Sequence, residues 1–299
     1  MFFVSNSACE MPNFLNIAHR GGAQLWPENT LPAFIAAARA GFDAAELDVQ
    51  LTRDDRLVVF HDFRLKPGLC RDSHGEWLRP RRFRRLSAIR DLSFDELRRY
   101  DVGRAKPGSL YARRHSRVAP FDGARMPSLS EVIAAVRREN PDFRLFIEIK
   151  TARRGRISAP PEAVADAVLD DVQSAGFLEN IVLVGFDWAG LTHAKKRNAD
   201  VQCWFTTDAR SRAGAHQVAT AGGDGWFPPL HRATDRAIET ARAYGLLVGV
   251  WTVNRAKDMQ RLIERGVDGI CTDRPDRLQR LLTNLQTKPS TDNVRQRTV

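Results

Sequence analysis

The chain has 299 residues, of which 43% are hydrophobic, and a formal charge of +10 at pH 7. This composition is ordinary for a globular protein with a sizeable core, and it excludes disorder as the default. The length allows two small domains or one large α/β barrel. Much of the positive surplus lies in "RPRRFRR", residues 79–85, which predicts a local basic patch.

The four cysteines, Cys9, Cys70, Cys203 and Cys271, lack C-x-x-C spacing. We therefore predict reduced thiols, and neither a zinc site nor a disulfide framework. Residues 1–14 have no basic start and too short an apolar portion for a signal peptide. Because no run approaches the roughly 18 apolar residues of a membrane helix, we expect a cytoplasmic protein, with residues 1–14 as an N-terminal tail.

Eight short apolar runs typical of buried strands occur at residues 16–19, 44–51, 145–150, 181–186, 201–205, 225–229, 246–251 and 268–272. Helical spacing of apolar residues occupies residues 30–41, 128–140, 160–176, 234–245 and 256–266. This alternation predicts an α/β fold, a (β/α)8 TIM barrel over residues 15–282 whose catalytic mouth lies at the C-terminal ends of the strands. Residues 283–299 are polar and are expected to form a frayed tail.

One further apolar run, "LVVFHD" at residues 57–62, follows the second strand after only "TRDDR". A parallel crossover needs about a dozen residues or more, so these two runs should form an antiparallel hairpin. If the second strand overshoots the mouth, the return arm of the hairpin brings His61 back to it.

The stretch from about residue 64 to 126 loses clean periodicity and gains arginine, proline and glycine. We interpret it as an insertion in the second βα connection, placed above the mouth. It either shapes substrate access or is simply a decorated loop.

Acidic residues recur at the ends of two predicted strands. "ELDV" puts Glu46 and Asp48 on one face of the second strand, and "FIEIK" does the same for Glu148 and Lys150 on the next barrel strand. Three carboxylates on adjacent strands suit a hard divalent cation, Mg2+ or Ca2+. The alternative is a buried ion-pair network of these groups with Arg20.

Basic residues converge on the same mouth. The first strand ends in "NIAHRGG", which sets His19 and Arg20 at its exit, and the hairpin supplies His61. Two histidines beside a metal suit general acid–base catalysis at neutral pH. Arg20 and Lys150 suit an anionic substrate such as a phosphoryl group. Together these residues predict metal-assisted cleavage of a phosphate ester.

The order of these residues resembles the glycerophosphodiester phosphodiesterase family. The segments that carry the resemblance are "AHRGG", "PENTLPAF", "ELDVQLTRDDRLVVFHD", "FIEIK", "WTVN" and "GICTDRPD", in order between about residues 16 and 277. "YDVGRAKPGSLYA" and "MPSLSEV" resemble the insertion and re-entry segments of bacterial members.

The resemblance implies a role for each matching position. His19 and His61 match the catalytic histidines; Glu46, Asp48 and Glu148 match the metal ligands; Arg20 and Lys150 match the phosphate-contacting cations. In "PENT", Glu28 could orient Arg20 and Asn29 could cap the following helix. Trp251 matches an aromatic wall against the substrate, with a core tryptophan as the alternative. Cys271 stands where the family usually has an aliphatic residue, and we interpret it as a buried thiol and not a nucleophile.

The family implies hydrolysis of a glycerophosphodiester, such as glycerophosphocholine or glycerophosphoethanolamine, to glycerol 3-phosphate and an alcohol. The attacking hydroxyl is either water or the glycerol 2-hydroxyl. The alternative is phospholipase D-like hydrolysis of lysophospholipids on the same barrel, with the basic insertion in weak contact with a membrane surface. A nucleic-acid-binding module is disfavoured because the sequence holds no nucleic-acid motif.

Overall fold

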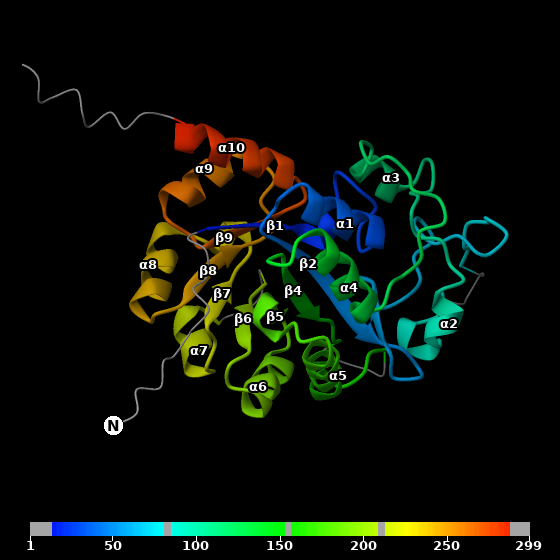
Figure 1. The fold of residues 1–299 in the computed structure, drawn as a ribbon, viewed down its shortest axis with the longest axis horizontal. Coiled ribbons are helices and arrows are strands. Elements are labelled where there is room, and N and C mark those ends of the chain that lie inside the picture. Colours follow the sequence, from blue (N-terminus) through cyan, green and yellow to red (C-terminus); the bar gives the residue numbers. More distant parts are fainter. Residues whose placement is uncertain (1–13, 81–84, 153–156, 209–212, 288–299) are drawn as a thin grey trace, which may run out of the picture.

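Eight parallel strands close into a barrel in the computed structural model, which describes residues 14–80, 85–152, 157–208 and 213–287 (Figure 1). The strands are β1 (Leu15–Ala18), β2 (Ala44–Leu51), β4 (Arg144–Ile149), β5 (Ile181–Gly185), β6 (Gln202–Thr206), β7 (Gly225–Phe227), β8 (Leu247–Val250) and β9 (Gly269–Thr272). Each pairs in parallel with its neighbour, and β1 pairs with both β2 and β9, which completes the ring. The predicted TIM barrel is therefore confirmed.

The helices that cover the barrel are α1 (Leu31–Arg39), α4 (Leu129–Glu139), α5 (Pro161–Ser174), α6 (Trp188–Arg197), α7 (Ala215–Thr220), α8 (Asp235–Ala243), α9 (Ala256–Glu264) and α10 (Pro275–Thr287). The sequence predicted α1, α4, α5, α8 and α9. It missed α6, α7 and α10. Helix α7 has only six residues, too few to show a helical period, and α6 is largely polar, so its apolar pattern is weak.

The C-terminal boundary predicted at residue 282 lies inside α10, which continues to Thr287. The last turns of α10 are polar and half-buried or exposed, so composition alone made them resemble a tail. The predicted N-terminal tail and the end of the predicted C-terminal tail lie outside the described residues, except Phe14.

The predicted hairpin is present. Strand β3 (Leu57–Val59) pairs antiparallel with the second half of β2, in the register Val49↔Val59 and Leu51↔Leu57. After the hairpin, the Phe60 backbone N–H donates to the Asp48 carbonyl at 3.0 Å. The return arm thus arrives beside the inward-facing end of β2 and delivers the residue after Phe60 to the mouth.

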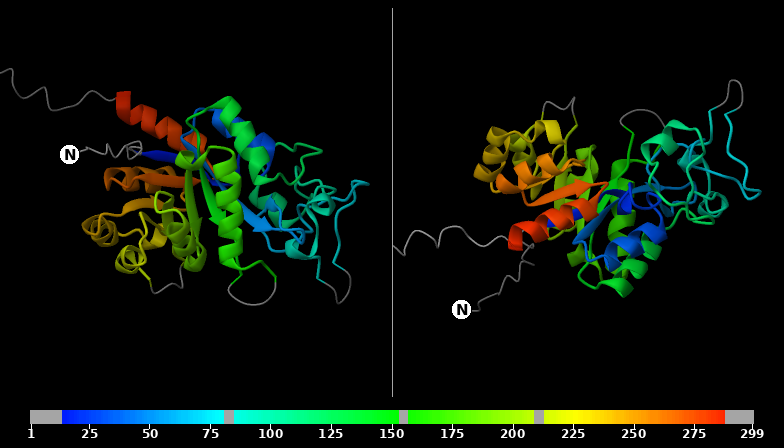
Figure 2. Two further views of the ribbon diagram at one scale, coloured as in Figure 1. Left: turned by 60° about the horizontal axis from the view of Figure 1, so that its bottom comes forward. Right: turned by 90° about the horizontal axis from the view of Figure 1, so that it is seen from above.

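The insertion lies at one side of the barrel, beyond β3 (Figure 2). It contains α2 (Phe94–Leu97), α3 (Leu110–Arg114) and one 3-10 turn, η2 (Ile89–Asp91). These short elements share a small apolar core of their own, separate from the barrel core, formed by Val58, Phe60, Leu65, Leu69, Cys70, Ile89, Phe94, Leu97, Val102 and Met126. Of the predicted basic patch, Arg81, Arg82 and Arg84 lie outside the described residues.

The barrel interior changes from apolar to charged along β2 and β4. Its lower part holds Phe146 and Trp204, packed edge to face with ring centroids 5.1 Å apart. Glycines make room for Trp204, since a Cβ at Gly225 or Gly249 would lie 2.6 Å from its side chain. On the same face of β2, Ala44 is followed by acidic residues towards the C-terminal end. The aromatic residues therefore fill the lower interior, and the charged residues lie above them at the C-terminal ends of the strands.

Cys70, Cys203 and Cys271 are buried and free, whereas Cys9 lies outside the described residues. Burial raises the pKa of the Cys70 and Cys203 thiols to about 12, so these thiols stay protonated near neutral pH. Among the described helices, none combines the length and apolar character that crossing a membrane requires. The cytoplasmic location stays a prediction.

Candidate active site

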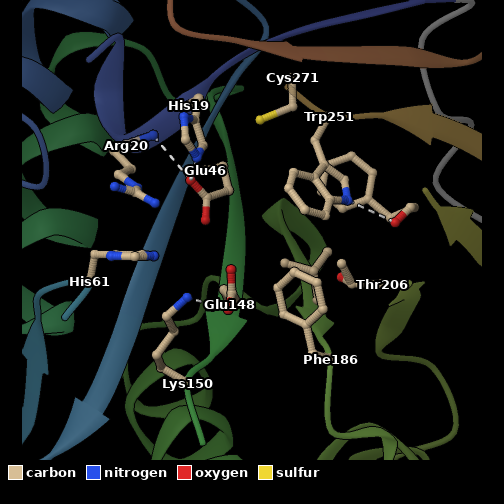
Figure 3. A pocket seen from close by; sticks show the side chains of 12 residues that line it. His19, Arg20, Glu46, His61, Glu148, Lys150, Phe186, Thr206, Trp251 and Cys271 are labelled. Atoms are coloured by element: carbon tan, nitrogen blue, oxygen red, sulfur yellow. Dashed lines mark hydrogen bonds and ion pairs between the residues drawn. The ribbon is translucent and has the colours of Figure 1, made fainter. Parts of the chain in front are cut away.

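The turn that follows β1 is tight and left-handed. His19 and Arg20 begin the 3-10 turn η1 (His19–Gly21), where Arg20 has φ 51° and Gly21 has φ 81°. A Cβ at Gly21 would lie 2.9 Å from the Cβ of Ala33 in α1. Glycine is therefore required for both the turn and the close approach to α1. This geometry aims the His19 and Arg20 side chains into the barrel mouth (Figure 3).

A pocket of about 200 Å³ occupies this mouth. Seven of the residues predicted from the sequence line it: His19, Arg20, Glu46, His61, Glu148, Lys150 and Trp251. Asp48 lies in contact with this group, while Glu28 and Asn29 stand behind Arg20 and Asp48. All ten predicted positions therefore gather at one end of the barrel.

Three carboxylates meet at the centre of the site. Asp48 and Glu148 are paired residues of β2 and β4, and one oxygen each of Glu46, Asp48 and Glu148 lie within 4.8 Å of one another. Within the described residues, Asp48 Oδ1 is buried without a hydrogen bond. Its nearest cation is the Lys150 ammonium, 3.2 Å away.

The predicted ion-pair network is also present, but its two cations pair with Asp48 and Glu148 more closely than with Glu46. Lys150 Nζ lies 2.8 Å from Glu148, and Arg20 Nε lies 3.3 Å from Asp48 Oδ2. Glu46 accepts the backbone N–H of Arg20 at 3.0 Å, and His19 Nε2 lies 3.8 Å from the same carboxylate. Burial opposes ionisation of Asp48, but Lys150 and Arg20 outweigh it and lower the pKa of that carboxyl. Burial and the neighbouring carboxylates raise the pKa of Glu46, so the cluster favours a further cation beside it.

His19 is held by a chain of hydrogen bonds that the sequence did not single out. Its Nδ1 lies 2.6 Å from Asp273 Oδ1, and Asn254 Nδ2 donates to Asp273 Oδ2 at 2.7 Å. Although burial opposes it, the bond to His19 lowers the pKa of Asp273. Asp273 and Asn254 lie in "GICTDRPD" and "WTVN", the segments that carried the family resemblance.

His61 enters the pocket from the turn that follows β3. Gln50, on the same face of β2 as Asp48, donates from Nε2 to the carbonyls of Phe60 and Asp62, at 2.6 and 3.1 Å, and so fixes the turn. The Nδ1 of His61 lies 3.5 Å from Asp62 Oδ1. His61 and His19 therefore face the carboxylate cluster from two different segments (Figure 3).

Glu28 makes the contact that its predicted role requires, since it accepts a hydrogen bond from Arg20 Nη1 at 3.2 Å. The prediction that Asn29 caps α1 was wrong. Thr30 is the N-cap, and its hydroxyl accepts from the Ala33 N–H. Asn29 precedes the cap with φ 56°, and its Nδ2 donates to Asp48 Oδ2 at 2.8 Å.

The insertion reaches the site through Glu28. The ring of Tyr111, in α3, stacks on His115 with centroids 4.1 Å apart, and His115 Nε2 lies 3.7 Å from Glu28 Oε2. Burial, followed by the charge of Glu28, raises the pKa of Tyr111. The insertion is therefore in contact with a residue that holds Arg20.

An aromatic wall closes the far side of the pocket. Trp251 Nε1 donates to the Phe227 carbonyl at 3.0 Å, and its ring meets Phe186 edge to face at 5.4 Å. Phe186 is 36% exposed and stands beside the mouth (Figure 3). Trp251 thus lines the pocket while packing against the barrel interior. The sequence offered no signal for Phe186 beyond its place at a strand end.

Comparisons with known proteins agree with this geometry. The sequence model of the glycerophosphoryl diester phosphodiesterase family matches residues 19–277. The chain is 30% identical over 268 residues to a glycerophosphodiester phosphodiesterase of Caldanaerobacter subterraneus subsp. tengcongensis, which covers 90% of this chain and 97% of the relative.

Solved structures share the fold. A Silicibacter pomeroyi protein assigned to the same family matches with a TM-score of 0.83 at 30% identity, over 92% of this chain and 94% of that one. An Oleispira antarctica phosphodiesterase, solved with the product sn-glycerol-3-phosphate, matches with a TM-score of 0.70 at 20% identity, over 89% of this chain and 96% of that one. The chain therefore belongs to the glycerophosphoryl diester phosphodiesterase family and is a phosphoric diester hydrolase.

Proposed function

We propose that this enzyme hydrolyses glycerophosphodiesters to glycerol 3-phosphate and an alcohol, with a divalent cation and with His19 and His61 as the general acid–base pair. The observation that carries the proposal is the meeting of both histidines, two cations and three carboxylates around one pocket. The product bound to the Oleispira antarctica phosphodiesterase supports the choice of a glycerophosphodiester as substrate.

The residues present fit a divalent cation. Glu46, Asp48 and Glu148 offer three oxygen ligands within reach of one ion, and Asp48 Oδ1 is a buried acceptor without a hydrogen-bond donor among the described residues. Oxygen ligands select hard cations such as Mg2+ or Ca2+. When bound, such an ion supplies Lewis-acid stabilisation of charge on the phosphoryl oxygens.

The side chains around the cluster divide the remaining work. Arg20 and Lys150 bring positive charge to the phosphoryl group, which stabilises its transition state. Asp273 holds Nδ1 of His19, so Nε2 is the atom left to exchange a proton in the pocket. One histidine accepts the proton of the attacking hydroxyl, from water or the glycerol 2-hydroxyl, while the other protonates the departing alkoxide. We assign these two roles to His19 and His61 jointly.

A panel of soluble and acylated diesters tests this proposal. We expect turnover of glycerophosphocholine or glycerophosphoethanolamine, measured as released glycerol 3-phosphate, to exceed turnover of lysophosphatidylcholine. Hydrolysis of lysophosphatidylcholine alone would favour the phospholipase D-like alternative. Turnover of none of the three, with the divalent cation present, would contradict the proposed substrate class.

Asp273→Asn should lower kcat by about tenfold or more, because an amide no longer stabilises a protonated His19 and can hold the wrong tautomer. A purely structural role would leave the pH dependence of kcat/KM unchanged. We instead expect the part of the profile that follows protonation of His19 to move to lower pH, because the variant lacks the carboxylate that stabilises the protonated ring. Steady-state kinetics between about pH 5 and 9 measures both. Asp142→Asn, in an exposed loop, is the matched control and should behave as wild type.

A further inference from the structure

A second hollow, of about 270 Å³, lies between the insertion and the start of α10. Two short segments supply its arginines. Arg114 ends α3 and Arg117 follows that helix, while Arg274 precedes α10 and Arg277 lies in its first turn. It shares no lining residue with the catalytic pocket. The catalytic role of the first pocket therefore does not account for the arginines of this hollow.

The charges around this hollow are poorly balanced. Arg274 makes a bidentate pair with Asp276, at 2.8 Å for both nitrogens, and Arg277 donates to the Asn254 carbonyl. Across the described parts of the chain, the Arg114 and Arg117 side chains have neither an ion pair nor a hydrogen bond. Four guanidinium groups thus surround one hollow, while the nearby carboxylates of Asp276 and Glu28 face Arg274 and His115. Arg114 and Arg117 stay unbalanced, an arrangement that favours an anion.

Guanidinium groups match the geometry of both carboxylate and phosphate, because their forked N–H groups donate to two oxygens at once. A phosphate dianion carries twice the charge of a carboxylate and therefore balances several unpaired guanidinium groups better. We propose that this hollow is a binding site for a tetrahedral phosphate dianion, separate from the catalytic pocket. The dianion is either free inorganic phosphate or the headgroup of a lipid such as phosphatidic acid. Both present the same tetrahedral group to the four arginines.

The test compares two double variants with equal loss of charge. Arg114→Gln with Arg117→Gln removes the two unpaired lining cations, whereas Arg113→Gln with Arg138→Gln removes two exposed arginines outside the hollow. Because the substituted residues make no ion pair among the described residues, the melting temperature without phosphate should stay at the wild-type value in both. Phosphate binding at the catalytic pocket is common to all three proteins and cancels in the comparison.

Isothermal titration with inorganic phosphate at constant ionic strength is the first arm. We expect wild type and the control to bind with equal affinity and stoichiometry, and the Arg114/Arg117 variant to lose the second site or bind there about tenfold more weakly or worse, the effect of losing one charge-assisted contact. The second arm measures co-sedimentation with phosphatidylcholine vesicles that contain or lack phosphatidic acid.

Each result has one meaning. Binding of inorganic phosphate that depends on Arg114 and Arg117 identifies a free phosphate ligand. Binding of phosphatidic acid vesicles alone with the same dependence identifies a lipid headgroup. If the Arg114/Arg117 variant matches the control with both probes, the proposed site does not exist.

Discussion

Replacing His19 or His61 with alanine is expected to lower kcat by about 10²- to 10⁴-fold, the usual scale for a general acid or base. Both side chains line the catalytic pocket, and neither belongs to the three-carboxylate cluster. The variants should therefore still bind the divalent cation. Steady-state kinetics at saturating cation, with calorimetric titration of the cation, measures the two effects separately.

A matched histidine serves as the control for this prediction. His74 lies exposed in the insertion, so His74→Ala should keep the wild-type kcat. A near-normal kcat in His19→Ala would make that histidine structural and would remove it from the proposed mechanism. Loss of cation binding in either variant would assign the histidine to the metal site instead.

Loss of any of the three carboxylates is expected to weaken binding of the divalent cation and to abolish most activity. Glu46→Ala, Asp48→Ala and Glu148→Ala each remove one of the oxygen ligands that converge on the cluster, and a chelator should have the same effect on wild type. Calorimetric titration with Mg2+ and with Ca2+ measures the affinity. Glu239→Ala, on the exposed face of α8, is the control, and an unchanged affinity in any cluster variant would exclude that residue from the site.

Two conservative variants of the carboxylate cluster should differ in thermal stability when the divalent cation is removed. Asp48→Asn removes the negative partner of Arg20 and Lys150 and leaves two largely buried cations undercompensated, so its melting temperature should fall. Glu46→Gln retains an acceptor for the Arg20 N–H and removes a buried charge that faces two other carboxylates. Its melting temperature should equal or exceed that of wild type, as thermal unfolding with chelator can show.

The sequence predicted the barrel well because its strands are nearly continuous apolar runs and because five of its helices have clear periodicity. Local pattern was less informative at the site. Asn29 looked like a helix cap, but the cap is one residue further on, and the left-handed backbone turns Asn29 towards Asp48. Asp273 contacts His19 from 254 positions away, a pairing that only the closure of β1 against β9 creates.

The insertion was the hardest part to predict for a related reason. Its core is made of single apolar residues spread over a long irregular stretch, which gives neither a period of 3.6 nor one of 2. The contact between His115 and Glu28 depends on where that core places α3. No short-range pattern in the sequence encodes that position.

Strand β2 sets the spacing between the carboxylates and His61 in the active site. Glu46 and Asp48 lie on one face of it, and Gln50 on the same face pins the turn that carries His61. Adding or deleting one residue between positions 46 and 50 would reverse the facing of every residue beyond it. A change of length in this stretch would therefore disrupt the site, whereas the insertion after His61 can grow or shrink while the spacing between the carboxylates and this histidine stays constant.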